Sequence, residues 1–454
     1  MKINIVRSEF LRAWQMAERC SSTRSTVSSL AGVFLDANED RVLLSATDLK
    51  TSIRCVAEGV SVARNGTAIL PVKLLGELFK KVPADRFTIE VKDEKGALTA
   101  GRNRTRFSTW FADEFPRLPQ SESAKHLCDV ASPELLRILI EGSIASSPTD
   151  DFPKYLGACL IQLKDGVLRV ISTDSRRLSL SRCLYEGGDG EADLLLPLVP
   201  LRELQRLLSS VGDVSVRILY DGSLAWFQMG QIEFSIRRVE STFPNYEKIL
   251  NPNKTTMMLA NRSELLSALD RIDIIVRSHT RLVVMHLSPG GQLKLTGKAP
   301  EFGTAVEELD ATIDGEPLKA GFNVGFLQDG LKSLGSDDIK MNLNGDAGQM
   351  TLHRQDTDDF LYMLMPVRIT EQDMIDPDEE DPFEDEPALE RTQKEGLFAG
   401  AEAAVSAGEK ALSPEGEVFP GEISPRKASS NENPEEDEAL EALKTLERVS
   451  KEEG

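Results

Sequence analysis

Two kinds of short motif in this 454-residue chain could carry catalysis. Asp150-Asp151 and Asp337-Asp338 are adjacent carboxylates, and carboxylate pairs can hold a divalent cation such as Mg²⁺. Both pairs lie among residues typical of turns, so we interpret them as solvated turns. Gly187-Gly188-Asp189-Gly190 lacks the following lysine and hydroxyl residue of a phosphate-binding loop, which favours an ordinary loop. The five cysteines and four histidines show no metal-ligand spacing, so we expect no catalytic residue, no metal site and no cofactor.

A Thr-Asp pair occurs twice at a fixed interval. Thr47-Asp48 and Thr173-Asp174 are 126 residues apart (173 − 47). Threonine and aspartate side chains commonly bond to nearby backbone groups. We therefore interpret the pair as a device at a turn or strand end, not as catalytic residues.

Basic residues lie mostly off the apolar stripes of the predicted helices. In any single helix, such residues are explained by an ordinary solvent-exposed surface. If the helices line one face of an array, the same residues attract a phosphate backbone without reading bases. These basic residues are Arg7, Arg12, Arg19, Lys73, Lys80, Lys81, Arg137, Arg202, Arg206, Arg262, Arg271 and Lys332.

The strands and helices that must position these residues are predicted by a sequence pattern that occurs three times along the chain. The predicted strand-to-helix junctions centre on Pro71, Pro197 and Asn323, spaced by 126 (197 − 71 and 323 − 197). Predicted helices span 7–19, 72–82, 132–143, 200–209, 261–276 and 324–334. Alternating strands follow at 87–91, 214–218 and 339–343. This period is that of a domain, far longer than the roughly 20–50 residues of a solenoid repeat.

Charge divides the chain at about residue 370. Residues 371–454 contain 26 acidic and 8 basic residues, a net of −18, so the first 370 carry −21 − (−18) = −3. We predict three α+β domains over 1–122, 123–253 and 254–370, followed by a disordered acidic tail over 371–454. The cysteine pattern and the absence of long apolar runs favour a reduced, cytoplasmic setting.

Four motifs, in this order and spacing, resemble the β subunit of bacterial DNA polymerase III, the sliding clamp, over about residues 1–369. The motifs are Thr173-Asp174-Ser175-Arg176-Arg177-Leu178, Phe243-Pro244-Asn245-Tyr246, Gly321-Phe322-Asn323-Val324 and 362–369, which contains Met365-Pro366-Val367-Arg368. The resemblance implies a DNA-clamp fold: three similar domains of antiparallel sheets with two helices each, forming a head-to-tail ring with a second copy. It implies a non-catalytic, nucleoid-associated processivity factor that encircles duplex DNA without sequence preference. Its implied partners are the replicative polymerase, an ATP-dependent clamp loader, and further polymerases and repair proteins that bind through short linear motifs.

Site residues follow from the same resemblance, position by position. A pocket for partner peptides would be walled by Leu156, Thr173, Ser175, Arg176, Arg177, Leu178, Pro244, Ile249, Met363, Met365, Pro366, Val367 and Arg368. Ser175-Arg176 departs from the family, which usually has glycine followed by histidine or tyrosine there.

The resemblance also implies DNA contacts and a dimer interface. DNA would meet Arg24, Lys154 and Tyr155, and the basic helix residues add Arg7, Lys80, Arg137, Arg202 and Arg206. Leu198-Val199 replaces basic residues that the family often has. The interface between copies would use Ile274 and Ile275, with Arg104 and Arg106 pairing with Glu301 and Glu307 of the other copy.

Two other functions remain open on the sequence alone. One is a three-domain scaffold that keeps the peptide pocket and does not encircle DNA. The other is a nuclease or transferase, against which the lack of a clustered carboxylate motif counts. The helical basic residues favour the clamp over the scaffold.

Overall fold

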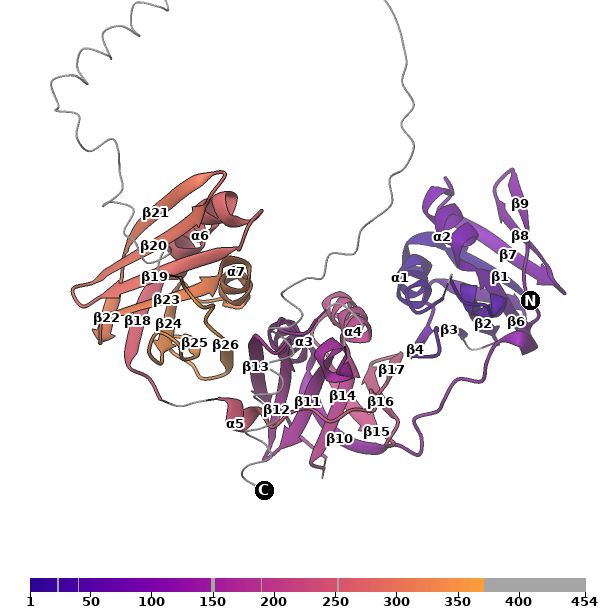
Figure 1. The fold of residues 1–454 in the computed structure, drawn as a ribbon. Helices are drawn as coiled ribbons and strands as arrows, with labels where there is room; N and C mark the ends of the chain where they lie inside the picture. The colour runs from indigo at the N-terminus through magenta and orange to yellow at the C-terminus, as the bar shows by residue number, and fades with distance from the viewer. Residues whose placement is uncertain (23, 40, 148–151, 189, 251–252, 371–454) are drawn as a thin grey trace, which may run out of the picture. The chain divides into compact units, whose positions relative to one another are not determined.

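The structure is a computed structural model that describes residues 1–370 except 23, 40, 148–151, 189 and 251–252. Contacts between residues group Met1–Arg368 into one compact unit, the first unit of the chain. The predicted disordered tail and the Asp150-Asp151 pair lie outside the described residues. The description below concerns the first unit, whose elements are labelled in Figure 1.

In its described residues, the first repeat contains nine strands and two long helices. Its helices are α1 (Arg7–Glu18) and α2 (Val72–Lys81), with short 3-10 turns η1 (Ser28–Ala31) and η2 (Ala112–Glu114). Its strands are β1 (Lys2–Val6), β2 (Gly32–Ala37), β3 (Val42–Thr47), β4 (Thr51–Val56), β5 (Val60–Arg64), β6 (Gly66–Pro71), β7 (Arg86–Lys92), β8 (Lys95–Ala100) and β9 (Asn103–Ser108).

The second repeat follows a similar order, but it has four strands between its two long helices where the first has five, and it ends in an extra short helix. Its helices are α3 (Ser132–Gly142), α4 (Leu198–Val211) and α5 (Tyr246–Ile249), with the 3-10 turn η3 (Lys154–Gly157). Its strands are β10 (Lys125–Ala131), β11 (Ala158–Lys164), β12 (Val167–Thr173), β13 (Arg177–Leu184), β14 (Ala192–Pro197), β15 (Ser215–Tyr220), β16 (Leu224–Met229) and β17 (Ile232–Arg237).

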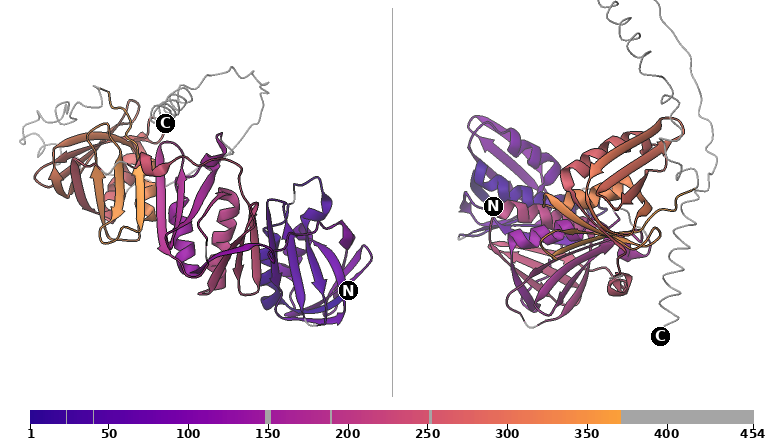
Figure 2. Two further views of the ribbon diagram at one scale, coloured as in Figure 1. Left: turned by 90° about the horizontal axis from the view of Figure 1, so that it is seen from below. Right: turned by 90° about the vertical axis from the view of Figure 1, so that its left-hand side faces the viewer.

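The third repeat completes the series. Its helices are α6 (Arg262–Val276) and α7 (Val324–Ser333). Its strands are β18 (Thr256–Asn261), β19 (Leu282–Ser288), β20 (Gln292–Ala299), β21 (Gly303–Asp310), β22 (Thr312–Gly315), β23 (Leu318–Asn323), β24 (Asp338–Leu343), β25 (Met350–Arg354) and β26 (Phe360–Leu364). The predicted α+β class is confirmed, and the repeats can be followed by colour in Figure 2.

The three predicted strand-to-helix junctions are confirmed. Strands end at Pro71, Pro197 and Asn323, and a helix begins at the next residue each time. Both prolines hold φ at −67°, an extended start that proline's ring enforces. Asn323 instead caps α7, because its side chain accepts a hydrogen bond from the Phe326 N–H at 3.2 Å.

Two large sheets run across the boundaries between repeats. The eight-stranded sheet has the order β10-β15-β16-β17-β4-β3-β2-β6, so β17 of the second repeat pairs with β4 of the first. The nine-stranded sheet has the order β14-β11-β12-β13-β26-β25-β24-β18-β22, so β13 pairs with β26. We call the β4–β17 pairing the first seam and the β13–β26 pairing the second seam.

The helices pack in pairs, α1 with α2, α3 with α4, and α6 with α7 (Figure 1). In the first pair, Phe79 meets Phe10 and Trp14 edge to face, with ring centroids 5.5 and 4.8 Å away. The spacing of apolar residues in 72–82 also predicts a buried Leu74, and this prediction is wrong. Leu74 is 43% exposed, whereas Leu75 and Phe79 fill the buried face. Among the described residues, no helix is both long and apolar enough to cross a membrane.

Candidate functional site

The site begins with the turn between β12 and β13. The Thr173 hydroxyl donates to the Arg177 carbonyl at 2.7 Å, and Asp174 Oδ1 accepts from the backbone N–H groups of Arg176 and Arg177, both at 3.0 Å. These bonds hold Ser175 at φ 75°, a left-handed conformation that is uncommon outside glycine. The two central residues of the turn are therefore held in a fixed, outward-lying loop.

The same turn occurs 126 residues earlier. Thr47 donates to the Thr51 carbonyl at 2.6 Å, and Asp48 accepts from the Lys50 and Thr51 N–H groups at 2.9 and 2.6 Å. Leu49 has φ 72°, as Ser175 has 75°. The interpretation of the repeated Thr-Asp pair as a turn device is confirmed.

The two seams differ in what lies beneath these turns. At the second seam Leu178 lies opposite Met363, and both are buried in an apolar cluster with Ile171 and Tyr246. At the first seam the corresponding pair is Ser52 and Ser235, whose hydroxyls bond to each other at 2.6 Å. An apolar floor thus exists at the second seam, whereas the first seam is closed by a satisfied polar pair.

An exposed apolar rim lies beside that floor. The Met365 N–H donates to the Arg176 carbonyl at 2.9 Å, and the Val367 N–H donates to Gly321 at 2.8 Å. This anchored backbone leaves the side chains of Met365 and Val367 42% and 43% exposed. Large apolar side chains kept in solvent beside a buried apolar cluster suit the anchoring of another chain's apolar residues.

The remaining predicted pocket residues come from three other segments. Leu156 is buried on η3, and Ile249 on α5 packs against the apolar cluster. Tyr155 contacts Phe243 edge to face at 5.9 Å, which places η3 beside the segment that carries Pro244. Pro366 is half-buried, and Arg176 and Arg368 are exposed.

Arg177 has a second task that sequence reasoning missed. Its guanidinium pairs with Asp174 at 2.8 Å and with Asp329 of α7 at 2.7 Å, and it lies 4.2 Å from the centroid of the Phe326 ring. The side chain is 10% exposed, so its positive charge is paired with carboxylates of the second and third repeats. Arg177 joins one end of the second seam and presents little charge to a partner.

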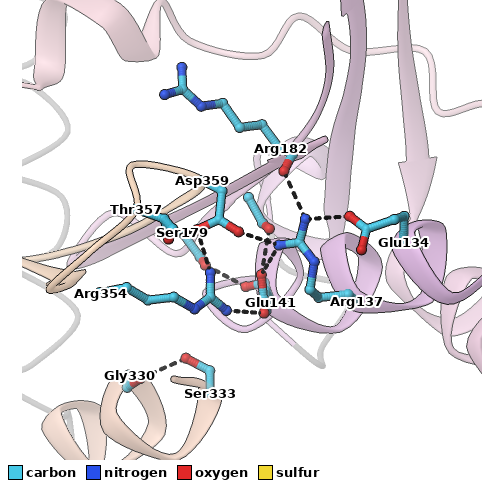
Figure 3. Close-up of polar contacts among 11 residues, drawn as sticks. Glu134, Arg137, Glu141, Ser179, Arg182, Gly330, Ser333, Arg354, Thr357 and Asp359 are labelled. Atoms are coloured by element: carbon cyan, nitrogen blue, oxygen red, sulfur yellow. Dashed lines mark hydrogen bonds and ion pairs between the residues drawn. The ribbon is translucent and has the colours of Figure 1, made fainter. Parts of the chain in front are cut away.

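A second ion cluster joins the other end of the same seam (Figure 3). Arg137 of α3 contacts Glu141 and Asp359, both at 3.0 Å, and Glu134 at 2.7 Å. Arg354 pairs with Asp359 at 2.7 Å and also contacts Glu141. Because Asp359 precedes β26 and Glu141 lies on α3, the cluster connects the second and third repeats.

This cluster changes the interpretation of Arg137. Three carboxylates and the Arg182 carbonyl surround its guanidinium, so it is engaged within the protein. Its predicted role against DNA gains no support from these contacts. The sequence signal was the i, i+3 and i, i+4 spacing of Glu134, Arg137 and Glu141, which is typical of ion pairs along a helix.

The other predicted DNA contacts lie in varied settings. Arg24, Lys154 and Arg202 are exposed, and Tyr155 is half-buried. Arg7 donates to the Val82 carbonyl at 3.0 Å, Lys80 lies 3.7 Å from Glu77, and Arg206 pairs with Glu203. Much of the helical basic charge is thus offset locally. Asp337 and Asp338 are exposed at the start of β24, which agrees with a solvated turn.

The predicted interface residues lie on free sheet edges and on α6. Arg104 and Arg106 are exposed on β9, and Glu301 is exposed just before β21. Ile274 is 60% exposed, whereas Ile275 packs against the core of its own repeat. Glu307 is held by Arg271 through two contacts of 2.6 Å, which lower the pKa of its carboxyl, so it already has a partner within the chain.

The fold defines a class of protein: a repeated two-helix, antiparallel-sheet domain joined edge to edge. Sequence profiles assign residues 1–119 to the N-terminal domain and residues 247–368 to the C-terminal domain of the DNA polymerase III beta subunit. The chain belongs to this family.

Individual relatives agree. A beta sliding clamp of Synechococcus elongatus is 28% identical over 378 residues, covering 81% of this chain and 100% of that protein. One from Pseudomonas aeruginosa is 28% identical over 375 residues with the same coverage. The crystal structure of the DNA polymerase III subunit beta from P. aeruginosa has a TM-score of 0.76 at 27% identity, over 81% of this chain and all of that one.

Proposed function

We propose that this chain carries out the sliding-clamp function of its family as a head-to-tail ring of two copies closed around duplex DNA. The family makes it a non-catalytic processivity subunit that works with DNA and the replicative polymerase. The observation that carries the ring is the repetition of one strand pairing within the chain.

Both seams use strands at the same positions of the repeat. Strand β4 is the third strand after the first helix of its repeat, and β13 and β21 hold that place in the second and third repeats. Strand β17 is the last strand of its repeat's second group, and β26 and β9 are its counterparts. The seams pair β4 with β17 and β13 with β26. In the described part of the chain, β9 and β21 are left as sheet edges.

In both seams, the third strand after the first helix of one repeat pairs with the last strand of the other repeat. Strands β21 and β9 hold these two positions, so they form a matching pair of edges. The pairing of β21 of one copy with β9 of another repeats the internal seam, and two such pairings close a ring. Arg104 and Arg106 of β9 would lie near acidic β21, where Glu308 and Asp310 are exposed while Glu307 is engaged by Arg271. Opposite charges along the joint set its register more than its strength.

A ring that encircles DNA needs little affinity for it, which agrees with the modest basic charge of the helices. A clamp that must slide cannot bind phosphates tightly, and many helical arginines and lysines here already face local carboxylates. We assign the predicted basic residues other than Arg137, together with Tyr155, to weak, sequence-independent contacts with DNA; these are Arg24, Lys154, Tyr155, Arg202, Arg7, Lys80 and Arg206. Arg137 is left out because its guanidinium is held within the protein. The apolar pocket at the second seam would accept short peptides from the polymerase, the clamp loader and repair proteins, in the cytoplasm at the nucleoid.

Retention on DNA tests this function. The protein is loaded by its cognate ATP-dependent clamp loader onto nicked circular plasmid, which is then linearised with a restriction enzyme in half of the sample. We expect the protein to elute with the circle and to leave the linear DNA. Equal retention on both would show that it holds DNA by affinity, and retention on neither would favour the scaffold that binds peptides without encircling DNA.

A further inference from the structure

The side of the first seam that faces the helices is apolar. Ile53 of β4 lies opposite Phe234 of β17, and both are fully buried. Two residues on, the buried Cys55 thiol donates to a carbonyl of α1 at 3.6 Å, which places this side of the strand against that helix. The ion pair of this seam, Arg54 with Glu233, lies on the other side, because side chains alternate along a strand.

The equivalent positions of the second seam are polar. Ser179 of β13 stands 126 residues after the isoleucine of the first seam and lies opposite Tyr362 of β26. Ser181 takes the place of the thiol. Both hydroxyls donate to Glu141 of α3, that of Ser179 to the carbonyl at 2.5 Å and that of Ser181 to the carboxylate at 2.6 Å (Figure 3). The apolar side of the second seam is therefore the opposite one, which holds the pocket floor.

The apolar cores of the repeats divide accordingly. The first two repeats share one cluster of buried apolar side chains, which contains Ile53 and Phe234. Among the described residues, the cluster of the third repeat takes its buried members from that repeat alone, and half-buried Ile144 of the second repeat packs against it. A smaller cluster that contains Leu178 and Met363 adds an apolar link. Apolar burial thus holds the first seam more than the second.

Charged side chains take over the helix-facing side of the second seam. Glu141 is 7% exposed and pairs with Arg354 of β25. Asp359 contacts both Arg354 and Arg137, at 2.7 and 3.0 Å. We call these four residues the clasp. Removing one member of a buried ion pair leaves the other as an uncompensated charge, so the clasp holds only while its members are together.

At the first seam, uncharged residues hold three of the four places of the clasp. Leu11 and Gln15 of α1 stand 126 residues before the arginine and the glutamate of α3. Gln231 takes the place of the aspartate, because each carbonyl accepts from the strand across its seam. The donors are the N–H groups of Val56 at 3.4 Å and of Arg182 at 2.9 Å. The clasp is therefore a feature of the second seam, where the shared apolar core is missing.

We propose that the third repeat is a body with its own core, which the clasp docks onto the first two repeats. Opening at the second seam, where β13 parts from β26, precedes opening at the first seam, where β4 and β17 share a core. The pocket floor takes Leu178 from one side of the second seam and Met363 from the other, so opening of the clasp also takes the pocket apart. The inference does not rest on peptide binding, because it concerns the relative stability of the two seams.

Hydrogen–deuterium exchange of the full chain compares the two seams directly. We expect the amides that bond across the second seam to exchange about tenfold faster than those across the first. Glu141→Gln should speed exchange at the second seam about tenfold further and leave the first seam unchanged, because Arg137 and Arg354 lose an anionic partner. The amides that join β19 to β20 inside the third repeat should stay protected.

Glu77→Gln is the matched control, since Glu77 of α2 also pairs with two cations, Lys80 and Lys81, and lies outside both seams. Equal exchange at the two seams of the unmodified protein would overturn the inference, as would a second seam that Glu141→Gln leaves at the unmodified rate. Faster exchange of β19 and β20 to the same degree would show unfolding of the repeat in place of undocking, and would also overturn it. If Glu141→Gln does not fold, Asp359→Asn makes the same test.

Discussion

At the scale of single residues, one pair of facing side chains distinguishes the two seams. The two seams have the same turn, the same left-handed residue and the same strand pairing. Leu178 opposite Met363 makes the second apolar, whereas Ser52 opposite Ser235 makes the first polar. The buried hydroxyls of Ser52 and Ser235 are tolerated because each bonds to the other. A polar pair of this kind provides no apolar surface for the apolar anchor of a peptide.

The rim residues should dominate peptide affinity without supporting the fold. Replacing Met365 and Val367 together with alanine should weaken a clamp-binding peptide about tenfold or more, because both exposed side chains lose apolar contact area. The measurement is fluorescence anisotropy with thermal unfolding in parallel. Leu184→Ala is the control, since Leu184 is 78% exposed at the far end of β13. Unchanged affinity in the double variant would exclude this surface as the pocket.

At the scale of elements, the second seam is fixed at both ends by ion clusters. Arg177 joins β13 to α7, and the cluster of Arg137, Glu141, Arg354 and Asp359 joins α3 to β26. At the first seam Arg54 pairs with Glu233 at 3.2 Å and donates to the Leu118 carbonyl. In the proposed pocket, this double fixation would hold the walls in place before a peptide arrives and so lower the ordering cost of binding.

Asp359 should make this seam sensitive to acid. Burial raises the pKa of Asp359, but hydrogen bonds from Thr357 and Arg354 and the charges of Arg354 and Arg137 outweigh it, so the pKa lies below its usual value. A carboxyl with a lowered pKa contributes stability that is present above its unfolded pKa of about 4 and is lost as pH falls through the lower folded value.

The expected result is a loss of stability below about pH 4 that is smaller in Asp359→Asn, which cannot titrate there. Urea unfolding between pH 7 and pH 3 measures it. The variant should also be less stable than the unmodified protein at pH 7, because Arg137 and Arg354 lose an anionic partner. Parallel pH curves for the two proteins would contradict the assignment.

At the scale of the whole molecule, the strand pairings inside one chain predict how two chains meet. The seam rule assigns β9 and β21 to each other, and exposed Ile274 on α6 lies in the same repeat as β21. A heterologous joint of this kind closes only if each copy supplies both edges.

Ile274→Asp should separate the copies, because a buried charge without a partner is costly at an apolar joint. Sedimentation velocity should show a protomer in place of a dimer, with retention on circular DNA lost as well. Ile140→Asp is the matched control, since Ile140 is 48% exposed on α3 and lies outside both edges. A dimer that persists in Ile274→Asp would place the joint elsewhere.

The sequence by itself determined the repeat, the three strand-to-helix junctions, most helix bounds and the Thr-Asp turns. These features depend on local patterns: an apolar period, a proline or asparagine before a helix, and hydroxyl and carboxylate groups near backbone donors. The predicted pocket residues also lie around one seam, the second, although their contact with a peptide stays a prediction.

Only the tertiary structure decided what each charge does. The sequence predicted that Arg137 meets DNA, Arg177 lines the peptide pocket and Glu307 lies at the interface between copies. Each also has a distant partner within the chain, 222, 152 and 36 residues away in Asp359, Asp329 and Arg271. Pairings at such separations follow from how the sheets join, and no local pattern in the chain encodes them.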